Sequence, residues 1–150
     1  MRDFSPYMVR SMRAGLRKSV LIENTGACLA MATILIIDDE EVIRVFLRSV
    51  LEAAGYEVTE AVNGRQGLAL YRQRPVDLVI TDIVMPELNG LDMLLELTRE
   101  FLDAKVIAIS GAGEEKNVLD VAKLLGARQT FQKPFSMPQL LGAVRYELEH

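Results

Sequence analysis

Short apolar runs alternate with longer, mixed stretches five times along this chain, from residue 33 to residue 148. The apolar runs predict strands over residues 33–37, 56–60, 77–81, 105–109 and 129–132. The third of them lacks strict alternation, as expected for a strand that is buried on both faces of a sheet. The stretches between and after the runs predict helices over residues 40–54, 65–73, 90–102, 115–125 and 136–148.

Alternating strands and helices predict an α/β fold, in which helices cover both faces of a parallel sheet. Because right-handed crossovers leave few topologies, the order 2-1-3-4-5 is the usual arrangement of five such strands. Gly55 is expected to end the first helix, Asn63-Gly64 to form a turn, and Ser136 to cap the last helix. Six apolar residues of the first helix are expected on one stripe, namely Val42, Ile43, Phe46, Leu47, Val50 and Leu51.

Residues 1–32 lie outside this pattern and precede the predicted domain of residues 33–148. The first thirty residues carry five Lys or Arg against two Asp or Glu, whereas the remainder carries twelve against nineteen. Met31 stands two residues before the first strand, so we interpret the extension as a mobile tail or an over-long start. A basic, weakly amphipathic segment that binds a surface or a partner is the alternative.

Composition limits the classes of function. At 150 residues the chain fits one domain, and no apolar run approaches the roughly 18 residues of a membrane span. The acidic body argues against direct binding of nucleic acid. A single cysteine, Cys28, excludes an internal disulfide and is consistent with a reducing compartment, so we expect a cytoplasmic location.

Polar residues that can carry chemistry stand where four of the predicted strands end. Asp38 and Asp39 follow the first strand, Asp82 the third, Ser110 the fourth and Lys133 the fifth. Because ligands of open parallel sheets bind beyond the carboxyl ends of the strands, we expect these side chains to gather at one edge. Three carboxylates, a hydroxyl and an ammonium suit a divalent cation such as Mg²⁺ together with a phosphoryl group.

Each of these residues also has a plainer interpretation. The adjacent acids, with Glu40 and Glu41, could simply cap the helix that follows, because its dipole favours negative charge at its N-terminus. Asp82 could be a loop acid instead of a metal ligand or a nucleophile, and Ser110 and Lys133 could be ordinary loop residues. Their joint order and spacing favour the functional interpretation.

Four stretches, ILIIDDE, DLVITDIVMPELNGLD, VIAISG and FQKPF, resemble the response-regulator receiver domain of bacterial two-component signalling. The resemblance spans about residues 33–148. It implies a flavodoxin-like (βα)5 fold. It also implies that Asp82 accepts a phosphoryl group from the phosphohistidine of a histidine kinase.

The same resemblance implies roles for the other polar residues. Asp39, Asp82 and the Val84 carbonyl would coordinate Mg²⁺, with Asp38 acting mainly through water. Ser110 would hydrogen-bond the aspartyl phosphate, Lys133 would pair with it, and the peptide bond between Lys133 and Pro134 would be cis.

Two departures from the family pattern are visible. Three residues before the lysine, where the family often has Tyr or Phe, stands Thr130, and Phe131 beside it is expected in the core. Activation is therefore expected to depend on the 110–116 loop and the fourth helix. The two positions that usually tune hydrolysis hold Val84 and Ala112, which cannot orient water, so we expect slow autodephosphorylation.

The resulting hypothesis is a stand-alone, phosphorylation-dependent signalling module and not an enzyme that acts on other substrates. Its expected partners are a sensor histidine kinase and either a histidine phosphotransfer protein or a downstream effector protein. The effector would dock on the fourth helix, fifth strand and fifth helix. The alternatives are the receiver part of a longer regulator with a missing output domain, a module that is never phosphorylated, and a Mg²⁺-dependent phosphatase or phosphotransferase with Asp82 as nucleophile. Val84, where such phosphatases carry a second acid, argues against the last.

Overall fold

The computed structural model describes residues 31–85, 90–111 and 117–150. By its internal contacts the chain divides into Met1–Ala32 and Thr33–His150, and the description below concerns the second unit. The expectations for residues 1–30, for Ala112 and for most of the 110–116 loop lie outside the described residues.

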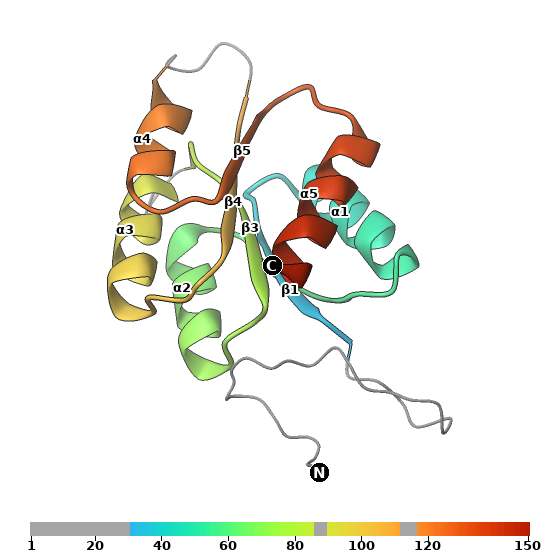
Figure 1. Ribbon diagram of the computed structural model, residues 1–150, viewed down its shortest axis with the longest axis horizontal. Helices are drawn as coiled ribbons and strands as arrows, with labels where there is room; N and C mark the ends of the chain where they lie inside the picture. Colours follow the sequence, from blue (N-terminus) through green and yellow to red (C-terminus); the bar gives the residue numbers. More distant parts are fainter. Residues whose placement is uncertain (1–30, 86–89, 112–116) are drawn as a thin grey trace. The chain divides into compact units, whose positions relative to one another are not determined.

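The predicted α/β fold is confirmed, with five parallel strands in the order β2-β1-β3-β4-β5 (Figure 1). The strands are β1 (Thr33–Ile37), β2 (Glu57–Ala61), β3 (Leu78–Asp82), β4 (Val106–Ser110) and β5 (Gln129–Gln132). β3 and β4 each extend one residue beyond the predicted end. Asp82 and Ser110 are therefore the last residues of strands, held in the ladder beside Ile109 and Gln132 respectively.

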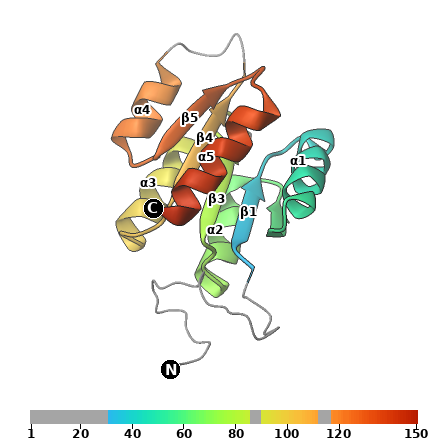
Figure 2. The same ribbon diagram turned by 45° about the vertical axis from the view of Figure 1, so that its right-hand side comes forward.

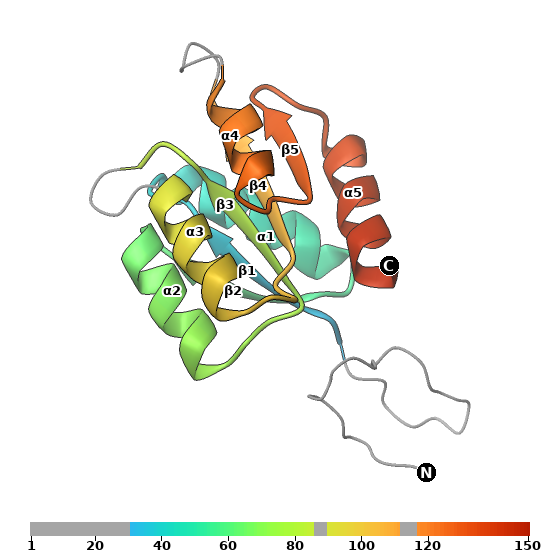
Figure 3. The same cartoon turned by 60° about the vertical axis from the view of Figure 1, so that its left-hand side comes forward.

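Five helices connect the strands: α1 (Glu41–Ala53), α2 (Gly64–Gln73), α3 (Gly90–Glu100), α4 (Val118–Leu124) and α5 (Met137–Glu149). α1 and α5 lie on one face of the sheet, and α2, α3 and α4 lie on the other (Figures 2 and 3). Successive strand residues point to opposite faces, so Ile34 and Ile36 pack with the α1 and α5 side while Leu35 and Ile37 pack with the other. Within the described residues, no helix has the length and apolar character needed to span a membrane.

The helix ends follow local chemistry. Ser136 accepts a hydrogen bond from the Gln139 amide at 3.1 Å and caps α5 as predicted. Gly55 follows α1 with a φ of 100°, a backbone conformation that residues other than glycine rarely adopt. Asn63 caps α2 through a 2.8 Å hydrogen bond from the Gln66 amide. The expected Asn63-Gly64 turn is thus the N-terminus of the helix itself.

The apolar stripe predicted for α1 is only partly buried. Leu47 and Leu51 are buried, whereas Val42 is 79% exposed and Phe46 is 51% exposed. The buried arc of α1 is set by its contact with β1 and β2 at one side of the sheet. Val42 and Phe46 lie beyond that arc and keep at least half of their surface exposed.

Ion pairs hold α1 against the edge strand β2. Arg44 donates to one carboxylate oxygen of Glu60 and Arg48 donates to the other, each at 2.9 Å. Arg48 also donates to Glu52 at 3.0 Å. The hydrogen bond from Arg48, partly opposed by burial and supported by Arg44, lowers the pKa of Glu60.

Gly90 allows α3 to begin directly against the end of β3. Its amide donates to the Ile83 carbonyl at 2.7 Å. A Cβ atom at this position would lie 2.6 Å from the Asp82 carbonyl oxygen and from the Ile83 Cα. Both are backbone atoms, which cannot move aside as a flexible side chain can.

Gly90→Ala should destabilise the fold by about 1–3 kcal/mol, because the new methyl group forces the backbone at Asp82 and Ile83 to shift. Gly142→Ala is the matched control, since its Cβ would meet nothing within 4 Å. It should stabilise α5 by about 0.5–1 kcal/mol. Urea unfolding followed by circular dichroism measures both free energies, and equal effects of the two substitutions would contradict this assignment.

Glu60→Gln should remove a pH-dependent part of the stability. The pKa of Glu60 lies below its ordinary value of 4.5. The contribution of Glu60 to the free energy of unfolding is therefore present above its pKa in the unfolded state, and it is lost as pH falls through its pKa in the folded state. Urea unfolding should show the wild type to be more stable than the variant at neutral pH, with the difference shrinking between about pH 5 and pH 3.

Glu57→Gln is the control for this titration. Glu57 is half-exposed and lies 3.6 Å from Arg74, a pair that is expected to contribute little. A difference between wild type and Glu60→Gln that stays constant with pH would show that the charge of Glu60 is not involved.

Candidate functional site

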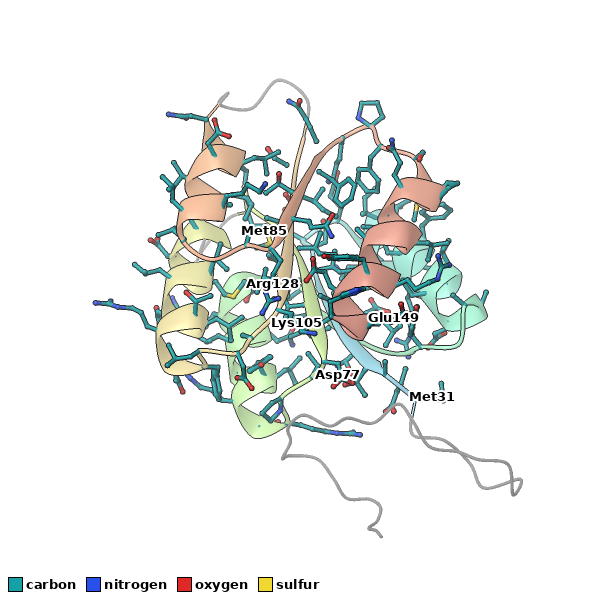
Figure 4. All side chains as sticks on the ribbon, viewed as in Figure 1. Met31, Asp77, Met85, Lys105, Arg128 and Glu149 are labelled. Atoms are coloured by element: carbon teal, nitrogen blue, oxygen red, sulfur yellow. The ribbon has the colours of Figure 1, made fainter. Side chains whose placement is uncertain are left out.

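Three carboxylates meet at the C-terminal edge of the sheet. One oxygen each from Asp38, Asp39 and Asp82 lies within 4.8 Å of the others. Asp38 and Asp82 are buried, at 3% and 6% exposure, and Asp39 is exposed. In Figure 4, the labelled Asp77 lies just before the start of β3, at the end of that strand opposite to Asp82. The adjacent acids converge because β1 ends at Ile37, so their side chains no longer alternate between faces.

The loop after β1 is organised around Asp38. Its amide donates to the Ala61 carbonyl at 3.2 Å, and its Oδ1 accepts a hydrogen bond from the Glu40 amide at 2.8 Å. Burial raises the pKa of the Asp38 carboxyl, although the Glu40 amide and the Lys133 charge act in the opposite direction. Glu40 stands at the N-cap of α1 without a side-chain capping bond, so capping does not explain its side chain.

Lys133 supplies the cation of the site. Its Nζ lies 3.6 Å from Asp82 Oδ2, 3.7 Å from Asp38 Oδ2 and 3.6 Å from Glu40 Oε1. Burial opposes the charged form, but the carboxylates of Asp82, Asp38 and Glu40 outweigh it and raise the pKa of Lys133. The ammonium therefore stays charged at neutral pH. Sequence reasoning missed Glu40 as a lysine partner, because that residue was considered only for the helix dipole.

The backbone around Lys133 brings β4 and β5 to the same edge. The Lys133 amide donates to the Ser110 carbonyl at 2.7 Å, and Ser110 itself is buried at the end of β4. The Lys133–Pro134 peptide bond is cis, the isomer that the resemblance implied. The side chain of Val84 is 47% exposed and therefore lies outside the core.

Thr130 and Phe131 lie on opposite faces of β5. Phe131 is half-buried, packs with the α5 side of the sheet, and lies 5.7 Å from the ring of Phe135. Phe131 was expected in the core, and the structure shows it partly buried and packed against the core. Thr130 pairs with Ala108 in the ladder and points to the α4 side.

The donor set fits a hard divalent cation. Oδ1 of Asp82 is buried and accepts no hydrogen bond among the described residues, while Oδ2 of the same carboxylate faces Lys133. Mg²⁺ binds through one or two protein carboxylates, and it retains several waters. The exposed Asp39 beside two buried acids leaves room for such a partly hydrated ion.

One residue that could not be found from the sequence contacts the acidic loop, which is the loop of Asp38 and Asp39 after β1. Arg44 Nη1 donates to the Asp38 carbonyl oxygen at 2.9 Å, in addition to its bond with Glu60. No spacing rule could have found it, because one partner precedes the helix and the other is on the next strand.

Comparisons with known proteins agree with this geometry. The family model for the response regulator receiver domain matches residues 34–145. The chemotaxis protein CheY of Thermotoga maritima is 37% identical over 112 residues, which cover 74% of this chain and 92% of that protein. The sensor kinase CckA of Brucella abortus is 33% identical over 155 residues, covering 97% of this chain and 16% of the kinase.

Solved structures show the same fold. The response regulator TrrA of Thermotoga maritima, solved in complex with Mg²⁺-BeF, is 32% identical and superposes with a TM-score of 0.71. The match covers 78% of this chain and 99% of TrrA.

Proposed function

The chain belongs to the response regulator receiver domain family, and from this premise we propose that it is a phosphorylation-dependent signalling module whose phosphoryl acceptor is Asp82. One observation carries the proposal: Asp82 ends β3 between two further carboxylates and the Lys133 ammonium. A buried carboxylate with a charged lysine 3.6 Å away is arranged to receive an anion once a metal ion offsets the remaining charge.

The proposed chemistry is transfer from nitrogen to oxygen. A carboxylate oxygen of Asp82 attacks the phosphorus of a phosphohistidine, a P–O bond forms, and the P–N bond breaks. The leaving imidazole nitrogen keeps the electron pair and takes up a proton. Lys133 pairs with an oxygen of the transferred group, and the Ser110 hydroxyl donates a hydrogen bond to another.

Mg²⁺ would be held by Asp39, Asp82 and the Val84 carbonyl, with Asp38 bound through water. When bound, it neutralises charge on the transferring phosphoryl group. Because Asp82 is the last residue of a buried strand, the protein residues would hold the acceptor carboxylate in a fixed position. The relative TrrA was solved in complex with Mg²⁺-BeF, which supports Mg²⁺ as the cation of the proposed site.

A sensor histidine kinase is the proposed donor, and a phosphotransfer protein or an effector is the proposed receiver of the signal. An open groove of about 730 Å³ beside β5 and α5 supports docking of an effector there. Its lining includes the rings of Phe131, Phe135 and Tyr146, and none of its residues carries a formal charge at neutral pH. The phosphatase alternative needs an acid two residues after Asp82, where this chain has Val84.

Incubation of the wild type with acetyl phosphate and Mg²⁺ should add the mass of one phosphoryl group, measured by intact-protein mass spectrometry. Asp82→Asn should add none, because an amide is no phosphoryl acceptor. Asp103→Asn, an exposed acid outside the site, is the matched control and should behave as the wild type. Phosphorylation of the Asp82→Asn variant would disprove the assignment of the acceptor.

The phosphorylated form should persist for minutes to hours after acetyl phosphate is removed. The exposed Val84 offers no group that can orient an attacking water, and Ala112 offers none by its composition. Loss of the added mass with time, followed in the presence of Mg²⁺, gives the rate. Val84→Asn, which introduces a polar side chain, should shorten the lifetime, and decay of the wild type within seconds would refute the prediction.

A further inference from the structure

One partly buried guanidinium, that of Arg44, ties the loop of Asp38 and Asp39 to the rest of the sheet. Arg44 lies in the first two turns of α1, and its side chain is 12% exposed. Its Nη1 donates to the Asp38 carbonyl at 2.9 Å, and its Nε donates to Glu60 Oε1 at 2.9 Å. The end of β1 is thereby connected to β2 through one side chain.

The Asp38 carbonyl belongs to the peptide plane that joins Asp38 to Asp39. Because that plane is rigid, the bond from Arg44 limits its rotation and with it the direction in which Asp39 leaves the backbone. Asp38 has further restraints, since its carboxylate binds the Glu40 amide and faces Lys133. For the Asp39 side chain, no hydrogen bond or ion pair is found within the described residues, so its direction depends on the backbone.

The guanidinium is itself held in place. Glu60 accepts from Arg44 with one oxygen and from Arg48 with the other, and Arg48 also binds Glu52. The planar guanidinium presents two donors in fixed directions, toward the carbonyl and toward the carboxylate. We call this pair of fixed donors the fork of Arg44. A lysine ammonium is a point charge on a flexible stem and cannot reproduce it.

We propose that Arg44 is a positioning residue for the metal site, which orients the Asp38–Asp39 peptide so that Asp39 is preorganised to bind Mg²⁺. The inference rests on the proposed function, since it presupposes that the site binds Mg²⁺. Groups behind the ligands of a metal commonly set affinity in this way.

Charge and geometry make opposite predictions for this residue. A positive charge near a cation site weakens cation binding, so loss of the charge by itself should tighten it. Loss of orientation should weaken it. Arg44→Lys keeps the charge and removes the fork, whereas Arg44→Gln removes both, so the pair of variants separates the two effects.

Isothermal titration with Mg²⁺ tests the proposal on the full chain. Both variants should bind Mg²⁺ more weakly than the wild type, by about tenfold in Arg44→Lys and by less in Arg44→Gln, where loss of the positive charge offsets part of the effect. Arg48→Gln is the matched control, because Arg48 shares Glu60 but makes no bond to the loop, and its affinity should be unchanged. Circular dichroism melting of each variant shows whether the fold is retained, since a purely structural role would lower the melting temperature without weakening Mg²⁺ binding.

Three results would overturn the inference. They are tighter binding in Arg44→Gln with unchanged binding in Arg44→Lys, unchanged binding in both, or an equal loss in Arg48→Gln. If the Arg44 variants do not fold, Glu60→Gln replaces them: it should weaken Mg²⁺ binding by less than tenfold, and unchanged affinity would again overturn the proposal. Absence of Mg²⁺ binding in the wild type would instead remove the proposed function itself.

Discussion

Burial of Asp38 and Asp82 at the end of the sheet is the constraint on which the site depends. Ionised carboxylates are costly to remove from water unless they are paired or hydrogen-bonded. Lys133 compensates part of this charge, and the Glu40 amide satisfies one oxygen of Asp38. Lys133 faces three carboxylates at once, which leaves a net negative charge around a buried oxygen of Asp82. That imbalance suits the site to the hard cation proposed for it.

The sheet allows the fold to tolerate this net negative charge, because each central strand packs against helices on both of its faces. Alternate residues of β1 pack with α1 and α5 on one side and with the other helices on the opposite side. Packing therefore holds the ends of β1 and β3 in place, independently of the charged side chains. Gly90 adds to this rigidity by letting α3 approach the backbone at Asp82. Buried charges that repel each other require such a frame, since a flexible loop would separate them.

α1 has two functions in this arrangement. Its buried residues Leu47 and Leu51 complete the core, and Arg44 and Arg48 connect it to Glu60 on the edge strand. The same helix leaves Val42 and Phe46 largely exposed, so its apolar surface is wider than the core requires. The helix that closes the core is therefore also the one that contacts the acidic loop.

The strand order, the positions of all five strands within one residue, and the gathering of Asp38, Asp39, Asp82 and Lys133 could be predicted from the amino-acid sequence. These follow from local rules, because apolar runs mark buried strands and the chirality of crossovers restricts their order. Three features could be known only from the folded molecule. They are which apolar residues of α1 are buried, the approach of Glu40 to Lys133 beside the two aspartates, and the bridge that Arg44 makes between Asp38 and Glu60. Such contacts join residues whose separation along the chain carries no periodic signal. They depend on how far a helix covers the sheet and on where a long side chain finds an acceptor, and both are set by packing in three dimensions.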